Sequence, residues 1–284
     1  MASMRDIKRR RDSIQSTGQI TKAMKLVSTV KLQKAKGKAE NTRPYSDLMY
    51  STVCNILAKS DNVDHKYLRA SESKKKAIIV ITANRGLAGG YNSNITKLIT
   101  DNPEISKDDA VIFAVGRKGK ELLERKGYKI AADYSEVINE PMYTDAREIC
   151  DEVLKLFSEG EIGEIHLAYT SFKNTVVHNP KLIQLLPVDP DISSDADDDI
   201  PMNYEPNEEE ALDMIIPKYM CSLIYGALIE SVASENGARM QAMDNATSNA
   251  EEMIADLSLK FNRARQGAIT QELTEIIGGA NAIE

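Results

Sequence analysis

The last part of the chain constrains the fold most, because it reads as one very long helix. No proline occurs in the 67 residues after Pro217. At about 1.5 Å per residue, a helix from Pro217 to Gly278 is about 90 Å long, too long to bury its stripe on one globular domain. Apolar or small residues recur there with a period near 3.5, which is typical of a coiled-coil seam, at Met243, Ala246, Ala250, Met253, Leu257, Phe261, Ala264 and Ala268.

A partner for this helix lies at the other end of the chain. Residues 3–59 are rich in the helix formers Lys, Arg, Gln, Ala and Met. We expect their apolar stripe to contain Ile7 and Ile14 and then Ile20, Ala23, Val27 and Val30. Pro44 is expected to kink or interrupt the helix. Because one helix precedes the middle of the chain and the other follows it, we expect them to pair antiparallel.

The middle of the chain alternates between strand and helix patterns. Short apolar runs predict strands at Ala77–Thr82, Ala110–Val115, Ile165–Tyr169 and Leu182–Leu186, and helices are expected at Asn92–Thr100, Lys118–Lys126 and Thr144–Ser158. This alternation predicts a mostly parallel sheet with helices on its faces. The predicted domains are an N-terminal coiled-coil helix (1–59), a central α/β domain (76–199) and a C-terminal coiled-coil helix (208–284).

Charge is distributed unevenly along the chain. Residues 1–43 carry twelve Lys or Arg against three Asp or Glu, whereas residues 189–213 carry eleven acidic side chains and no basic one. Without interleaved aromatic residues, the basic helix favours acidic protein partners over nucleic acid. No stretch approaches the roughly 18 apolar residues of a membrane span. The N-terminus resembles neither a secretory signal nor a transit peptide.

Several motifs raise alternatives to a purely structural role. The loop from Arg85 to Gly90 follows a strand and precedes a helix, where α/β folds bind phosphate, but it matches neither glycine-rich nucleotide motif. The basic turn at 116–120 and the acidic run Asp195–Asp199 are best explained as solvated loops. The three cysteines and three histidines lack metal-ligand spacing. The sequence therefore predicts no catalytic residue, cofactor or metal.

Three segments, in order along the chain, resemble the gamma subunits of F-type ATP synthases. They are Ile20–Val27 (ITKAMKLV), Thr82–Asn92 (TANRGLAGGYN) and Ala264–Ile276 (ARQGAITQELTEI), and Tyr204-Glu205-Pro206 before the last helix also fits. The resemblance implies an antiparallel coiled coil plus a Rossmann-like α/β domain. It implies a non-catalytic central-stalk rotor that couples rotation of a membrane c-ring to conformational change at beta-subunit catalytic sites.

The same resemblance implies partners and contact residues. One gamma chain is expected to serve three alpha and three beta subunits, together with an epsilon subunit and the c-ring. Contacts with the alpha/beta ring are implied for residues from three segments: Arg265, Gln266, Thr270, Met24, Lys22, Lys25, Arg85 and Ala88. Contacts with epsilon and the c-ring are implied for Tyr204 and Glu205. The expected location is the cytoplasmic face of a bacterial cell membrane, as a peripheral protein.

Three departures from the family pattern and two other hypotheses accompany this interpretation. Asn84 replaces the usual Asp and Ala88 the usual Cys, while Gly267 stands where Ala is common. A generic coiled-coil scaffold would self-associate through the C-terminal seam. An enzyme would bind a nucleotide at the loop that contains Gly89.

Overall fold

A computed structural model describes residues 4–59, 65–69, 73–175, 177–188 and 207–281. The long helices are α1 (Met4–Lys59) and α5 (Glu208–Asn281); between them lie β1 (Lys76–Ile81), α2 (Tyr91–Thr100), β2 (Ala110–Val115), α3 (Arg117–Arg125), β3 (Lys129–Asp133), a 3₁₀ turn (Val137–Asn139), α4 (Tyr143–Ser158), β4 (Glu164–Phe172) and β5 (His178–Leu186). The chain divides into two compact units. We call Thr29–Arg239 the sheet unit, and Met1–Ser28 with Met240–Glu284 the helical unit.

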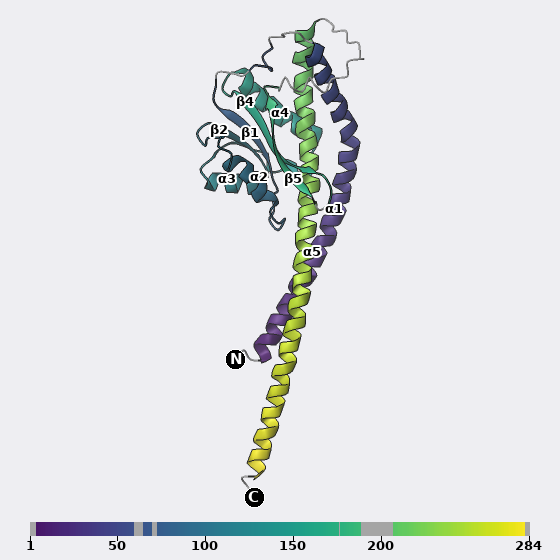
Figure 1. Ribbon diagram of the computed structural model, residues 1–284, viewed down its shortest axis with the longest axis vertical. Helices are drawn as coiled ribbons and strands as arrows, with labels where there is room; N and C mark the ends of the chain where they lie inside the picture. The colour runs from purple at the N-terminus through teal and green to yellow at the C-terminus, as the bar shows by residue number, and fades with distance from the viewer. Residues whose placement is uncertain (1–3, 60–64, 70–72, 176, 189–206, 282–284) are drawn as a thin grey trace. The chain divides into compact units, whose positions relative to one another are not determined.

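The sheet unit is built on five strands in the order β3-β2-β1-β4-β5, of which Figure 1 labels β2, β1, β4 and β5. The first four strands run parallel, and β5 pairs antiparallel with β4. The predicted mostly parallel sheet is therefore confirmed. The order reverses direction between β1 and β4, and in open α/β sheets such a switch point is the usual place for a ligand.

Helices cover both faces of this sheet, because alternate residues of each strand point in opposite directions. Ile79 and Ile81 of β1 pack in one core with residues of α4 and with Ile216 and Leu228 of α5. Ile78 of β1 packs in a second core with residues of α2 and α3. Strands buried on both faces read as continuous apolar runs, which is why β1 and β2 were predictable.

Strand β3 was not predicted from the sequence. Its residues alternate between exposed and half-buried positions, so Lys129–Asp133 contains no continuous apolar run. It lies at the edge of the sheet and pairs only with β2 among the described strands. Its position follows from pairing with β2, and pairing between distant strands leaves little trace in a short sequence window.

In the sheet unit, the second half of α1 runs antiparallel beside the first half of α5. The hydroxyls of Ser46 and Ser222 lie 3.1 Å apart, and Met49 and Val53 pack against Tyr219. Helix α1 continues through Pro44, so the predicted interruption is wrong. Burial of the following turns outweighs the roughly 3 kcal/mol cost of an internal proline.

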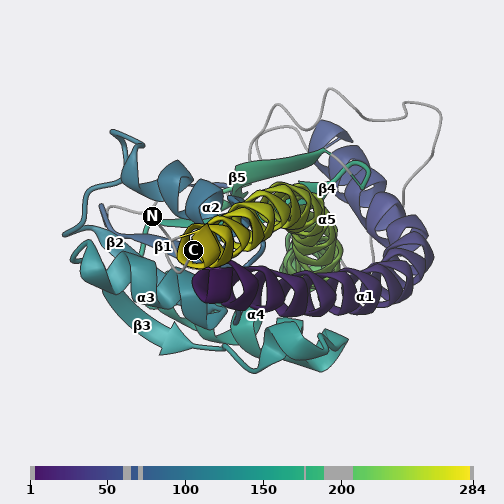
Figure 2. The same cartoon turned by 90° about the horizontal axis from the view of Figure 1, so that it is seen from below.

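The helical unit contains an antiparallel pair formed by the start of α1 and the stretch of α5 that follows Met240 (Figure 2). A Cβ on Gly18 would lie 3.3 Å from the Cβ of Ala250. One helical turn further along α1, the hydroxyls of Thr21 and Thr247 lie 2.8 Å apart. Residue numbers rise along one helix as they fall along the other, which confirms the predicted antiparallel coiled coil.

Part of the predicted seam is wrong. Ile7 and Ile14 are half-buried as expected, but Ile20, Val27 and Val30 are 58–66% exposed, and Ala23 is exposed as well. Within the helical unit, the buried positions of α1 are instead the small polar residues Thr21 and Ser28, because a seam that contains Ala250 admits only short side chains. On α5 the seam contains Met243, Ala250 and Leu257 as predicted, while Met253 is 53% exposed and Ala268 is exposed.

One helix, Glu209–Gly278, is long and apolar enough by composition to cross a membrane. Its most apolar 18-residue window has a mean hydropathy of 1.4, although the sequence was expected to contain no such stretch. More than half of that window, 56%, is buried inside the protein. The apolar character of α5 is explained by its place in the core beside the sheet.

Candidate functional site

The loop after β1 is held in place by the loop after β2. The hydroxyl of Thr82 accepts a hydrogen bond from the backbone N–H of Gly119 at 2.9 Å. Gly116 has φ +108°, and a Cβ there would lie 2.1 Å from the carbonyl oxygen of Thr82. Only glycine fits this approach, because the backbone of one loop occupies the space of a side chain. The two loops therefore form one rigid edge.

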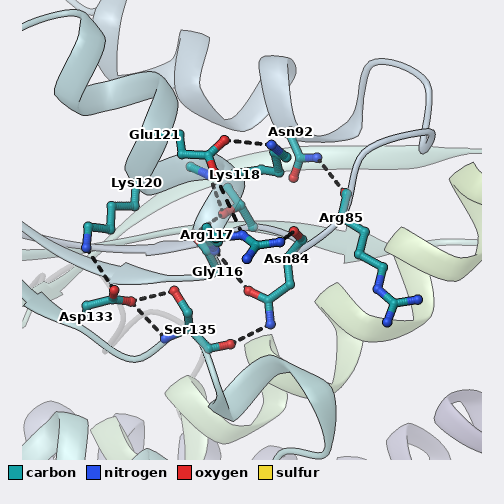
Figure 3. A network of polar contacts seen from close by, with 12 residues as sticks. Asn84, Arg85, Asn92, Gly116, Arg117, Lys118, Lys120, Glu121, Asp133 and Ser135 are labelled. Atoms are coloured by element: carbon teal, nitrogen blue, oxygen red, sulfur yellow. Dashed lines mark hydrogen bonds and ion pairs between the residues drawn. The ribbon is translucent and has the colours of Figure 1, made fainter.

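Asn84 links three segments at this edge (Figure 3). Its Nδ2 donates to the carbonyl oxygen of Ser135 at 2.7 Å. Its Oδ1 accepts from the backbone N–H of Arg117 at 2.9 Å. The amide uses both its donor and its acceptor, whereas the aspartate usual in the family has no donor for Ser135. The departure from the family pattern thus has a local structural reason.

Arg85 and Ala88 have opposite exposures. The Arg85 side chain is exposed and extends away from the polar network (Figure 3), and within the described residues it has no ion-pair partner. Ala88 is only 2% exposed and belongs to the core beside α2. Leu87, next to it, is 64% exposed with a positive φ of 62°. A partner at this loop would therefore meet Arg85 and Leu87 rather than the Ala88 side chain.

The basic turn at the start of α3 is paired within the chain. Lys118 Nζ lies 2.6 Å from Glu121 Oε2, which lowers the pKa of that carboxyl. Lys120 Nζ lies 2.9 Å from Asp133 Oδ2. The pKa of Asp133 is lowered, chiefly by the Ser135 hydroxyl and then by Lys120. These cations are neutralised locally, which favours the predicted solvated turn over an anion site.

Helix α5 is attached beside the loop at which a nucleotide would bind. The Arg239 guanidinium donates to the carbonyl oxygen of Gly86 at 3.3 Å, and the buried Tyr91 hydroxyl donates to that of Ser231 at 3.2 Å. On the neighbouring strand, the Ser234 hydroxyl donates to the carbonyl oxygen of Thr170 at 3.1 Å. No motif indicated this docking, since it joins residues more than 60 positions apart.

In the helical unit, three of the predicted contact residues lie within one turn of α1. Lys25 Nζ forms a 2.6 Å ion pair with Asp244 of α5. Met24 is half-buried, and Lys22 is exposed. Lys25 is thus partly used to pair the two helices, while Lys22 faces solvent.

The other predicted contacts lie near the end of α5. Arg265, Gln266 and Thr270 are all exposed, and the Thr270 hydroxyl donates to the Gln266 carbonyl oxygen at 3.0 Å. Every residue from 265 to 278 is exposed. Four of them carry large apolar side chains that are 50–63% exposed: Ile269, Leu273, Ile276 and Ile277. Tyr204 and Glu205, and the acidic run Asp195–Asp199, lie outside the described residues.

No group of three or more metal-ligating side chains occurs among the residues that the structure describes. His65 is buried and its Nε2 lies 3.1 Å from Asp213 Oδ1, while the backbone N–H of Tyr67 donates to Nδ1. His166 Nε2 lies 2.7 Å from Glu164. His65 therefore joins its segment to α5, whereas His166 pairs within its own strand, and among the described residues neither belongs to a cluster suited to metal binding.

Known proteins match this chain along its whole length. The ATP synthase gamma chain of Lachnoclostridium phytofermentans is 69% identical over 291 residues and covers 100% of both chains. A family model described as ATP synthase matches residues 3–283. This chain belongs to the ATP synthase gamma-chain family. Membership confirms the prediction of a rotor subunit that has no catalytic activity of its own.

Solved structures resemble the ATP synthase gamma-chain fold described here. A chain in the central stalk and c-ring structure of the Tetrahymena thermophila mitochondrial ATP synthase is 26% identical, with a TM-score of 0.58, over 80% of this chain and 99% of that one. A chain of the Euglena gracilis mitochondrial ATP synthase has a TM-score of 0.70 over 99% and 94% of the two chains. At 19% identity, the second likeness concerns the fold alone.

Proposed function

We propose that this chain is the shaft of a rotary ATP synthase and couples rotation to the catalytic sites of an alpha/beta ring. The observation that carries the proposal is the end of α5. Residues 265–278 are exposed and include four large apolar side chains, yet no described part of the chain covers them. Such a surface belongs against another protein. An enclosing ring of subunits supplies a partner on every side of the helix.

The expected contacts follow from exposure and charge. Arg265, Gln266 and Thr270 are proposed to meet the loops of the ring that hold the shaft. Lys22, Lys25 and Met24 are proposed to meet an acidic lever loop of beta, and Arg85 contacts the same lever. Each orientation of an asymmetric shaft then favours a different beta conformation, which is how rotation shifts populations at three sites.

The sheet unit is proposed to face the epsilon subunit and the c-ring. Tyr204 and Glu205 are assigned to that contact. Through the c-ring, the chain belongs at the cytoplasmic face of a bacterial cell membrane without spanning it. This assignment rests on the family and on the resemblance of the sequence rather than on any contact within this chain.

Two other functions fit the contacts less well. A generic scaffold would need the α5 seam free for self-association, but Ala250 and Thr247 already face α1. A nucleotide-binding enzyme would need the edge beside Gly86 open, and Arg239 and Tyr91 fix α5 there. Rotor function is consistent with the pairing of α1 with α5 and with the attachment of α5 to the sheet, because a shaft needs paired helices and a firm attachment to its base.

Reconstitution tests the proposal. The chain is mixed with alpha and beta subunits from the same source, and complex size and Mg-ATP hydrolysis are followed. We expect one copy per ring, and cooperative hydrolysis only when the chain is present. Arg265→Ala should lower this stimulated activity several-fold, whereas Arg263→Ala, at another exposed arginine two residues earlier, should change it little. A chain that neither enters the ring nor alters its activity would refute the rotor function.

A further inference from the structure

The last ten residues of α5 within the sheet unit are attached to the sheet and to α2 by hydrogen bonds. We call residues 230–239 the α5 clamp. The apolar contacts of α5 before this segment, such as Leu212, Ile216 and Met220, lie in the core shared with α4. Apolar packing keeps a helix close to its neighbours but has little directional preference. Hydrogen bonds in the clamp are directional and fix which face of the helix meets the sheet.

The clamp is held from two sides. On the side of β1 and α2, the Tyr91 hydroxyl donates to the Ser231 carbonyl oxygen at 3.2 Å. On the side of β4, the Phe172 backbone N–H donates to Glu230 Oε2 at 3.2 Å, and Ser234 donates to the carbonyl oxygen of Thr170. Turning α5 about its own axis would lengthen the bonds on both sides. The arrangement therefore resists rotation of α5 about its own axis, which is the motion that torque on this helix produces.

Gly237 brings the helix into close contact with β5. A Cβ on Gly237 would lie 2.7 Å from Cε1 and 3.3 Å from Nε2 of His178. The His178 ring stacks beside Phe172, with centroids 6.3 Å apart. Because the imidazole occupies the space of a side chain, position 237 has no room for one. Gly237 thus lets α5 approach the β4–β5 pair closely enough to form the neighbouring hydrogen bonds.

The clamp lies where force must pass along the chain. The two units are joined covalently only through α1, between Ser28 and Thr29, and through α5, between Arg239 and Met240. Just beyond its junction, α1 is tied to the turn before α4 by ion pairs of Lys34 and Lys38 with Glu140, at 3.2 and 3.9 Å. These pairs are exposed and therefore weak. The clamp, in contrast, includes two hydrogen bonds between buried groups, from Tyr91 to Ser231 and from Ser234 to Thr170.

We propose that the α5 clamp transmits torque between the sheet unit and the rest of α5, with Gly237 and Tyr91 as its positioning residues. The proposal rests on the rotor function proposed above. A loosened clamp lets α5 slip relative to the sheet without changing the residues that meet the alpha/beta ring. ATP hydrolysis then continues while less ion transport accompanies it.

The test uses inverted membrane vesicles that hold the whole ATP synthase. Gly237→Ala is compared with Gly226→Ala, also inside α5, where the nearest atom to a new Cβ is Ser46 Oγ at 3.9 Å. Both changes raise helix propensity equally, so only the contact with His178 differs. For Gly237→Ala we expect the ratio of ions pumped to ATP hydrolysed to fall about twofold, the value when half of the population slips. Gly226→Ala should leave it unchanged.

Two further variants make the result specific. The double variant His178→Ala with Gly237→Ala removes the steric overlap between the new Cβ and the imidazole ring. It should therefore recover part of the lost ratio of ions pumped to ATP hydrolysed. A general loss of stability would not be reversed by this second substitution. Tyr91→Phe removes the hydrogen bond to Ser231. If Gly237→Ala prevents assembly, the ratio of ions pumped to ATP hydrolysed is measured in Tyr91→Phe instead. Unchanged ratios in both Gly237→Ala and Tyr91→Phe would overturn the clamp. Failure of the unaltered chain to join the complex would instead count against the rotor function itself.

Discussion

At the scale of single residues, Gly116 joins the two loops at the edge of the sheet. Replacing it by Ala forces a Cβ to within 2.1 Å of the Thr82 carbonyl oxygen at a φ of +108°. We expect Gly116→Ala to lower the free energy of unfolding by more than about 3 kcal/mol, from strain and steric overlap together. Gly86→Ala, where nothing lies within 4 Å of the new Cβ, should change it by less than about 0.5 kcal/mol. Urea unfolding of the isolated chain measures both, and equal losses would contradict the steric explanation.

His178 should make stability depend on pH. Its ring nitrogens are buried, and neither has a hydrogen-bond partner in the described chain. Burial lowers the pKa of His178 below its usual value of 6.5. The folded chain therefore keeps the ring neutral where the unfolded chain takes up a proton, so this group stabilises the fold fully above pH 6.5 and progressively less below it.

The matching variant is His178→Gln. Relative to this variant, the unaltered chain should lose up to about 1.4 kcal/mol of unfolding free energy per pH unit below 6.5, until the folded pKa is reached. Urea unfolding at pH 7.5 and 5.5 gives the comparison. Other titrating groups cancel in the difference between the two proteins. Identical pH slopes would mean that the ring is hydrated in the folded chain.

At the scale of elements, the seam of the helical unit depends on small side chains. Gly18 faces Ala250 so closely that Gly18→Leu cannot be accommodated without moving the helices apart. We expect a cost of about 1–3 kcal/mol, typical of overpacking. Amide hydrogen exchange in residues 5–25 should speed up by about tenfold or more. Gln19→Leu, on the exposed neighbouring position, should leave exchange unchanged; equal effects would indicate that the seam is not where α1 and α5 meet.

Elements buried on both sides were predictable, and those whose partners lie far away in sequence were not. Strands β1 and β2 stood out as apolar runs, while β3 at the edge did not. Helical periodicity predicted Met243, Ala250 and Leu257 of the α5 seam correctly but misplaced most of the α1 seam. There, apolar Ile20 and Val27 face outward and Thr21 and Ser28 are buried. A seam set by close approach selects small side chains, which hydrophobicity alone does not detect.

The candidate contact residues were also predicted with mixed success, because some of their side chains are exposed and one is buried. Resemblance pointed to Arg85, Arg265 and Thr270, and all three are exposed and so accessible to a partner. It also pointed to Ala88, whose side chain is buried. Family motifs mark segments rather than individual surfaces, since motif positions combine residues that hold a loop with residues that face outward. The α5 clamp has no motif, because its bonds join strands and helices distant in sequence.

At the scale of the whole molecule, the sequence must both stabilise the fold and present a surface to partner subunits. Residues up to Ala264 contribute to folding: Leu257 is buried, and Arg11 lies 5.6 Å over the Phe261 ring. From 265 to 278 the described helix is exposed throughout. Stability and partner contact are therefore encoded in different stretches of the same helix, and removal of one stretch should affect only one property.

Truncation after Ala264 tests this division. We expect the free energy of unfolding to change by less than about 0.5 kcal/mol, because the removed residues 265–278 make no packed contact within the described chain. Stimulation of alpha/beta hydrolysis in reconstitution should fall sharply, since Arg265, Gln266 and the exposed apolar residues are lost together. Truncation after Asp256, which also removes Leu257 and Phe261, should lower stability as well. If the shorter cut destabilised the chain, or left ring stimulation intact, the exposed end of α5 would have a structural rather than a partner-binding role.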